Sequence, residues 1–230
     1  MKFRSWAGTV LGASMLCASP ALAVGIGFEC LTGSVSGDCA IGESQFVVTL
    51  SDQGGGLVRF HFINLGPEAS VLSEVYFDDG SLLALSAVID GPGVNFEPDA
   101  NPPNLPGGQL ATPPFQVTQG FLAASVPAPS MNGAGPSEWV AIEFTLQGGQ
   151  DFNDVVADLT TGALRIGIHV IAFDSGGSES FINVPVPEPG TGLLLALGPL
   201  GLGAKRRSDS SRQQSFEPRL LVDENRGIVR

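Results

Sequence analysis

The sequence predicts an all-β fold, a single β-sandwich or jelly-roll-like domain, for residues 24–184. Two observations lead to this prediction. Apolar residues recur with a period of two in several segments, and turns rich in glycine and aspartate separate those segments. Only residues 151–159 show a pattern that suits a helical turn or two. Short alternating strands without amphipathic helices are typical of sandwiches and jelly rolls.

Five segments show the alternation, with apolar side chains on one face and polar or small side chains on the other. The predicted inward-facing sets are Phe46, Val48 and Leu50; Val58, Phe60 and Phe62; Val71, Val75 and Phe77; Val140, Ile142, Phe144 and Leu146; and Leu164, Ile166, Ile168, Val170 and Ala172. In the third set, the polar face holds Glu74, Tyr76 and Asp78. Turn-forming residues lie at the strand ends, at positions 52–56, 78–80, 90–93, 147–149 and 174–177.

A proline-rich stretch, residues 96–129, interrupts this regularity with eight prolines. Neither flank carries enough strands to close a sandwich alone, so we interpret the stretch as a long surface excursion rather than a linker. The length of residues 24–184 also suits a single domain with a substantial core.

Residues 1–23 have the features of a secretory signal peptide. Lys2 and Arg4 give a cationic start, residues 10–17 are apolar, and Ala21-Leu22-Ala23 offers the small-x-small pattern of a signal peptidase site. We expect signal peptidase to cut after Ala23. A retained N-terminal anchor is the alternative, but the apolar stretch is short for a membrane span.

Removal of the signal peptide leaves two cysteines, Cys30 and Cys39, with eight residues between them. In an oxidising compartment such a pair predicts a disulfide. A loop of this size stabilises a fold by about 2 to 3 kcal/mol, chiefly by restricting the unfolded chain. Metal binding is the alternative, although two thiols without nearby histidines make a poor zinc site.

The predicted domain is strongly acidic. From Val24 to Glu188 the chain carries nineteen Asp and Glu residues against two basic residues, Arg59 and Arg165, for a net charge of −17. This charge repels nucleic acid and anionic lipid, so we expect no nucleic-acid partner. The negative charge attracts cations and favours solubility.

Candidate catalytic residues are few. His61 and His169 lie on the polar faces of their predicted strands, and they form a shared site only if those strands are adjacent. The sequence Gly177-Ser178-Glu179 lacks the second glycine of a nucleophile elbow. We therefore predict no catalytic residue and no enzymatic activity.

Carboxylates at turns are the candidate metal ligands. Asp78 and Asp79 could supply oxygens to a structural calcium ion, and the alternative is that these residues cap turns. Further candidates are Asp90, Glu97, Asp99, Asp151 and Asp154. Trp139 is the single tryptophan after cleavage and the candidate sugar platform, either facing solvent or packing against the proline-rich stretch.

Residues 185–207 combine three features in order. They are the motif Pro187-Glu188-Pro189, an apolar run over residues 190–204, and a basic stop, Lys205-Arg206-Arg207. A helix of this length reaches about 22 Å at about 1.5 Å per residue, against about 30 Å of hydrocarbon. We expect a short transmembrane segment with the basic stop on the cytoplasmic side.

This order of features resembles the C-terminal sorting signal of PEP-CTERM proteins, the exported substrates of exosortases in Gram-negative bacteria. The resemblance implies an exosortase that recognises Glu188 and cuts near Pro189. It also implies transient insertion in the inner membrane, followed by transfer to the cell surface or the extracellular polymer. Residues 208–230 extend beyond the usual end of family members, and their composition predicts a disordered tail.

Two functions remain open for residues 24–184. The favoured one is a non-catalytic cell-surface or extracellular-matrix component, associated with biofilm or exopolysaccharide. The alternative is a carbohydrate- or calcium-binding adhesive module. Both share signal peptidase and an exosortase as processing enzymes.

Overall fold

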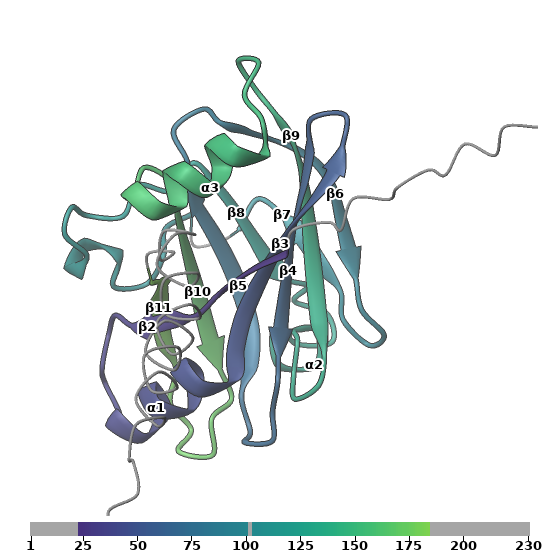
Figure 1. Ribbon diagram of the computed structural model, residues 1–230. Helices are drawn as coiled ribbons and strands as arrows, with labels where there is room; N and C mark the ends of the chain where they lie inside the picture. Colours follow the sequence, from purple (N-terminus) through teal and green to yellow (C-terminus); the bar gives the residue numbers. More distant parts are fainter. Residues whose placement is uncertain (1–22, 101–102, 185–230) are drawn as a thin grey trace, which may run out of the picture. The chain divides into compact units, whose positions relative to one another are not determined.

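A computed structural model describes residues 23–100 and 103–184. They form two antiparallel sheets, and the predicted all-β sandwich is confirmed (Figure 1). The predicted signal peptide up to Leu22, the sorting signal and the tail lie outside the described residues.

Each sheet mixes strands from both halves of the chain. Sheet A has the order β1 (Ala23–Ile26), β3 (Phe46–Gly54), β4 (Leu57–Asn64), β9 (Trp139–Leu146) and β6 (Leu83–Asp90). Sheet B has the order β2 (Phe28–Cys30), β11 (Glu179–Asn183), β10 (Arg165–Ile171), β5 (Val71–Asp78), β8 (Gln119–Ala123) and β7 (Phe96–Pro98). The described residues therefore fold as one unit, because each sheet needs strands from both halves of this region.

The main core lies between the sheets and is built around phenylalanine rings. Phe77 of β5 meets Phe60 of β4 and Phe144 of β9 edge to face, with ring centroids 5.1 and 4.8 Å apart. All three rings are fully buried. Edge-to-face packing suits the quadrupoles of aromatic rings. The predicted inward residues of β3, β4 and β9 all line this core, with Leu146 partly buried at its margin.

Two of the residues predicted to face the core, Val71 and Ala172, do not do so. Val71 is only half-buried, and Leu72 is buried in its place. The pairing of β5 with β10 shifts between His169 and Val170, and such a bulge reverses the alternation beyond it. Ala172 is exposed with a φ of 57°, because β10 already ends at Ile171.

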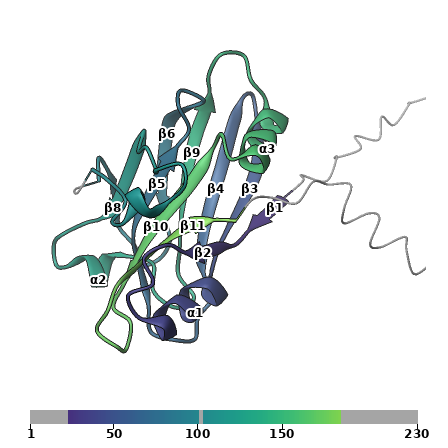
Figure 2. The same cartoon turned by 90° about the vertical axis from the view of Figure 1, so that its left-hand side faces the viewer.

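The proline-rich stretch forms a second, smaller core on the outer face of sheet B (Figure 2). Leu105 and Phe115 pack there with Tyr76, which is fully buried although the sequence places it on a polar face. Gly167 of β10 makes room, since a Cβ at this position would lie 2.7 Å from Leu105 Cδ2. The surface-excursion interpretation is thus incomplete, because the same stretch also supplies β7 and β8 to sheet B.

Helices fill the ends of the sandwich. The pattern at residues 151–159 becomes α3 (Phe152–Thr161), in which Asp151 and Asp154 form a reciprocal capping box. The sequence did not predict α1 (Ser36–Gln45), the short α2 (Pro129–Asn132) or the 3-10 turn η1 (Gly108–Leu110). Among the helices of the described residues, none combines the length and apolar character needed to cross a membrane.

The described chain begins and ends at one edge of the sandwich. β1 is the edge strand of sheet A, and β2, directly after Gly27, is the edge strand of sheet B. The last strand, β11, pairs with β2, and the Val184 N–H donates a hydrogen bond to the Gly27 carbonyl at 3.1 Å.

Candidate functional site

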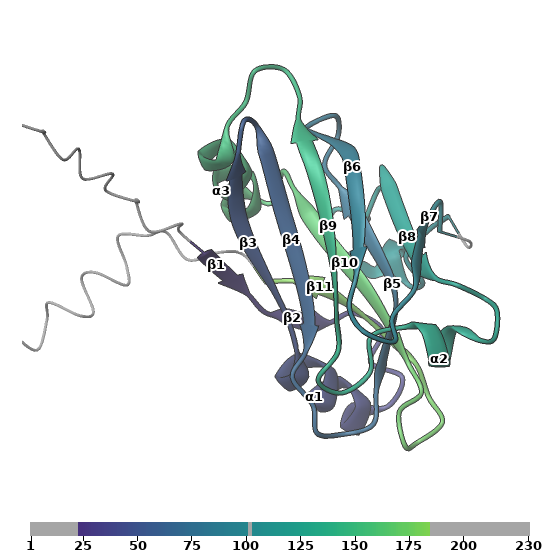
Figure 3. The ribbon, with the colours of Figure 1, turned by 90° about the vertical axis from the view of Figure 1, so that its right-hand side faces the viewer.

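The outer face of sheet A is open, in contrast to the covered outer face of sheet B. Seen from outside in Figure 3, no helix of residues 23–100 and 103–184 crosses β4 or β9. The strand register arranges the outward side chains in rows. One row joins Thr49, His61, Ala141 and Ile89; the next joins Ser51, Arg59, Glu143 and Ala87; and a third joins Val47, Ile63 and Trp139.

Differences in side-chain size along these rows produce a shallow depression, which we name the sheet A hollow. Arg59 and His61 of β4 lie between the smaller Thr49 and Ser51 side chains of β3 and the Ala141 and Trp139 side chains of β9. The volume is about 400 Å³. Its lining consists of Thr49, Ser51, Arg59, His61, Ile89, Trp139 and Ala141.

Trp139 lines the hollow on the outer face of sheet A. Of the two positions considered from the sequence, this is the solvent-facing one. The Gly91 N–H donates to the Trp139 carbonyl at 3.1 Å, and a Cβ at Gly91 would lie 3.1 Å from two indole carbons. Glycine thus lets the turn lie close to the ring. On its other neighbouring strand, His61 meets the indole edge to face with centroids 4.8 Å apart. The indole is therefore fixed before any ligand arrives.

An ion pair borders the hollow. Arg59 donates from Nε and Nη2 to the same oxygen of Glu143, at 2.8 and 2.6 Å. The Arg59 side chain is 39 % exposed and that of Glu143 15 %. Within the described residues, Arg59 Nη1 and Glu143 Oε2 take no part in these hydrogen bonds. The pair thus leaves one donor nitrogen and one acceptor oxygen outside its own hydrogen bonds.

His61 adds a neutral polar group. Burial, and then the positive charge of Arg59, lower the pKa of His61 below its ordinary value of 6.5. The imidazole is therefore uncharged at pH 7, with one donor and one acceptor nitrogen.

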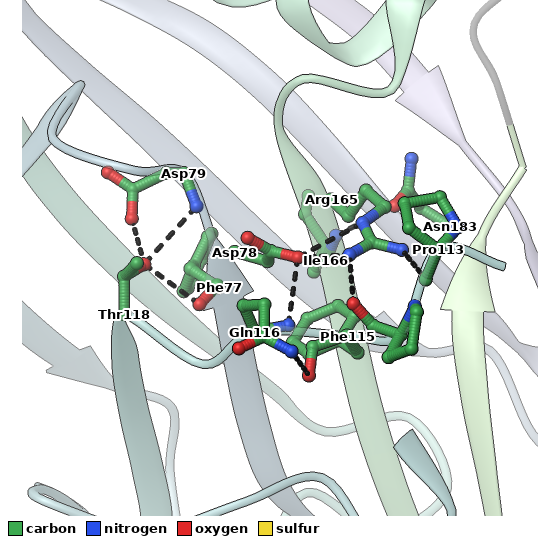
Figure 4. A network of polar contacts seen from close by, with 11 residues as sticks. Phe77, Asp78, Asp79, Pro113, Phe115, Gln116, Thr118, Arg165, Ile166 and Asn183 are labelled. Atoms are coloured by element: carbon green, nitrogen blue, oxygen red, sulfur yellow. Dashed lines mark hydrogen bonds and ion pairs between the residues drawn. The ribbon is translucent and has the colours of Figure 1, made fainter. Parts of the chain in front are cut away.

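The calcium candidates have protein partners (Figure 4). Asp78 Oδ2 pairs with the Arg165 guanidinium and accepts a hydrogen bond from the Gln116 N–H at 3.0 Å. Asp79 is buried, accepts from the Leu83 N–H at 2.7 Å and also binds the Thr118 hydroxyl. Both carboxylates thus hold turns and strand ends in place.

The remaining carboxylates are dispersed. Asp90 accepts from the Phe96 N–H at 3.0 Å, Asp151 and Asp154 cap α3, and Glu97 and Asp99 are exposed. In residues 23–100 and 103–184, the only grouping of three possible metal ligands is Cys30, Cys39 and Glu179. Its two sulfur atoms are joined in a disulfide, with the Cα atoms 5.4 Å apart.

The two histidines are not brought together. His61 is on β4 of sheet A, whereas His169 is on β10 of sheet B. His169 Nδ1 lies 3.1 Å from Glu74 Oε2, which also accepts from the Tyr76 hydroxyl at 3.0 Å. Burial raises the pKa of Tyr76, and the charge of Glu74 and its hydrogen bond raise it further.

A buried carboxylate anchors the segment before α1. Glu179 accepts from the N–H groups of Ser34 and Val35, at 3.0 and 2.5 Å, and from the Thr32 hydroxyl. Burial raises the pKa of Glu179, but these hydrogen bonds lower it by more, so its net pKa is below the ordinary value. Together with the disulfide, Glu179 fixes α1 against sheet B.

Sequence reasoning identified Trp139, His61 and Arg59 separately but did not place them in one site. They lie on β9 and β4, and the pairing of those strands brings them together. The alternation of each strand indicates only that these residues share an outward face. Searches of protein-family models, curated proteins and solved structures find no match to the chain.

Proposed function

We propose that this chain is an exported, non-catalytic component of the cell surface or extracellular matrix, associated with biofilm or exopolysaccharide. Signal peptidase removes residues 1–23, the segment 190–204 retains the chain in the inner membrane, and an exosortase releases it near Pro187-Glu188-Pro189. The observation that carries this proposal is the order of these segments around one acidic β domain.

The position of the domain ends supports this route. Gly27 and Val184 are hydrogen-bonded neighbours on the edge formed by β2 and β11. The described chain therefore begins and ends at the same edge of the sandwich.

The disulfide between Cys30 and Cys39 is consistent with the same route. Disulfides form and persist in oxidising compartments outside the cytoplasm. An exported chain meets such a compartment before it reaches the surface.

The use of the polar residues supports a non-catalytic role. His169 pairs with Glu74, Asp78 pairs with Arg165, and Asp151 caps a helix. These groups bind other parts of the protein and stabilise the fold. A general base, in contrast, must lie within hydrogen-bond reach of a substrate proton.

The test is C-terminal mass spectrometry of the full chain expressed in strains with and without an exosortase. We expect a product that ends near Pro189 only where the enzyme is present. Glu188→Gln should block the cut, whereas Glu97→Gln, which changes an exposed carboxylate of the domain, should leave processing unchanged. A product that retains residues 193–197 in the exosortase strain would refute the proposal.

A further inference from the structure

We propose that the sheet A hollow binds a neutral polysaccharide, with one sugar ring stacked on Trp139 and its hydroxyl groups bonded to the Arg59–Glu143 pair. The proposal concerns the folded domain alone. It does not depend on how the chain is exported or processed.

Shape and access are the first argument. The hollow is about 400 Å³, within the range of about 300 to 1,000 Å³ that small-molecule sites occupy. Its lining residues belong to β3, β4, β6 and β9 of sheet A, whereas the proline-rich stretch packs on sheet B. A flat, open face also lets a polymer extend beyond the ring that fills the hollow.

The second argument is the pairing of an aromatic surface with polar groups. Sugar rings carry C–H groups on their faces, and these pack on the negative π face of an indole. Their hydroxyl groups both donate and accept hydrogen bonds. Arg59 Nη1 is a donor and Glu143 Oε2 an acceptor, and within the described chain neither is used by the hydrogen bonds that join the two side chains. The Thr49 and Ser51 side chains line the opposite side of the hollow.

The third argument is preorganisation. Gly91 and His61 fix the indole, and Glu143 fixes the guanidinium through two hydrogen bonds. A ligand therefore does not have to order these side chains on binding, and that ordering cost commonly limits affinity.

Charge selects a neutral ligand over an acidic one. The −17 charge of residues 24–188 repels anionic polysaccharides. Glu143, beside the hollow, balances the charge of Arg59, and the second arginine of residues 24–188, Arg165, is paired with Asp78 on the other sheet. His61 is uncharged at pH 7 because of its lowered pKa. The hollow thus offers hydrogen bonds without net positive charge.

The experiment is affinity electrophoresis of the purified exported protein in gels containing dextran, galactomannan or hydroxyethylcellulose, with alginate as the anionic comparison. We expect retardation by at least one neutral polymer and none by alginate. Trp139→Ala should weaken binding at least tenfold. Met131→Ala, which removes a side chain 67 % exposed on α2, is the matched control and should bind as the unchanged protein does.

A second variant tests the site independently in case Trp139→Ala does not fold. Ser51→Phe keeps the outward position on β3 but fills the hollow, and it should also abolish retardation. Trp139 is the only tryptophan after Trp6, so its fluorescence in the exported protein reports directly on the site. Absence of binding to all three neutral polymers, or equal binding by folded Trp139→Ala, overturns the proposal. Because binding is measured on purified protein, failure of exosortase processing would not affect the result.

Discussion

The hydroxyl of Thr32 donates a hydrogen bond to the carboxylate of Glu179, although the two residues lie 147 positions apart in the sequence. Glu179 is 1 % exposed, and its carboxylate also accepts hydrogen bonds from the Ser34 and Val35 N–H groups in the segment that leads into α1. This single side chain ties the start of the domain to its last strand.

Replacing Glu179 with Gln should destabilise the domain. The amide keeps the size of the side chain but loses the negative charge and one acceptor oxygen. Hydrogen bonds to charged groups contribute about 1.5 to 3 kcal/mol each, and we expect a loss of free energy of unfolding in that range. Urea unfolding followed by circular dichroism measures it. Glu97→Gln, at an exposed position, is the control, and equal stability of the two variants would contradict the prediction.

The same carboxylate should give a pH-dependent contribution to stability. The pKa of Glu179 in the folded protein is lowered from its ordinary value of 4.5. The unfolded chain therefore takes up the proton first as the pH falls. The contribution is fully present above pH 4.5 and is lost as the pH falls through the lower folded pKa.

Urea unfolding of the unchanged protein and of Glu179→Gln at several pH values tests this. The difference in free energy of unfolding should be constant from pH 7 to about pH 5 and should shrink below that. Loss of stability near pH 6.5 comes instead from groups such as His61, whose folded pKa is also lowered, and both proteins should show it. If the difference in free energy of unfolding stays constant down to pH 3, the charge of the Glu179 carboxylate is not what produces it.

The strands could be predicted where alternation is strict, and the rest depended on contacts between distant residues. Phe60 and Phe62 are buried as their period of two predicts. In contrast, α1 has no apolar period, and it is held by the Cys39 disulfide and by close packing of Gly42 on Phe181. Tyr76 is buried because a segment from elsewhere in the sequence covers its face. The alternation of residues within one strand cannot show that a distant segment covers its outer face.

The same reason explains why the hollow was not predicted. Trp139 and His61 belong to diagonal positions on paired strands, and only the register of β4 with β9 makes them neighbours. Asp78 and Asp79 illustrate the converse case. Adjacent carboxylates in the sequence suggest a shared ion, yet the structure gives each carboxylate its own protein partners.

Asp78→Asn should destabilise the fold independently of calcium. Arg165 donates to Asp78 and to the carbonyls of Pro113 and Pro114, so it links the proline-rich stretch to β10. Loss of the charged partner should cost about 1.5 to 3 kcal/mol. Thermal unfolding in chelator and in millimolar calcium should give the same Tm for the unchanged protein. Asp174→Asn, at an exposed turn, is the control. A calcium-dependent rise in Tm that Asp78→Asn removes would restore the metal-site interpretation.

Two glycines of α1 should respond in opposite directions to the same substitution. Alanine is favoured over glycine in a helix by about 1 kcal/mol. At Gly37 an added Cβ would meet no neighbouring atom within 4 Å, so Gly37→Ala should stabilise the domain by up to about 1 kcal/mol. At Gly42 the Cβ would overlap the ring of Phe181, which is fully buried. Overpacking in a core costs about 1 to 3 kcal/mol, so Gly42→Ala should be net destabilising. Urea unfolding of both variants decides the matter, because stabilisation by both would mean that α1 does not pack on β11 as described.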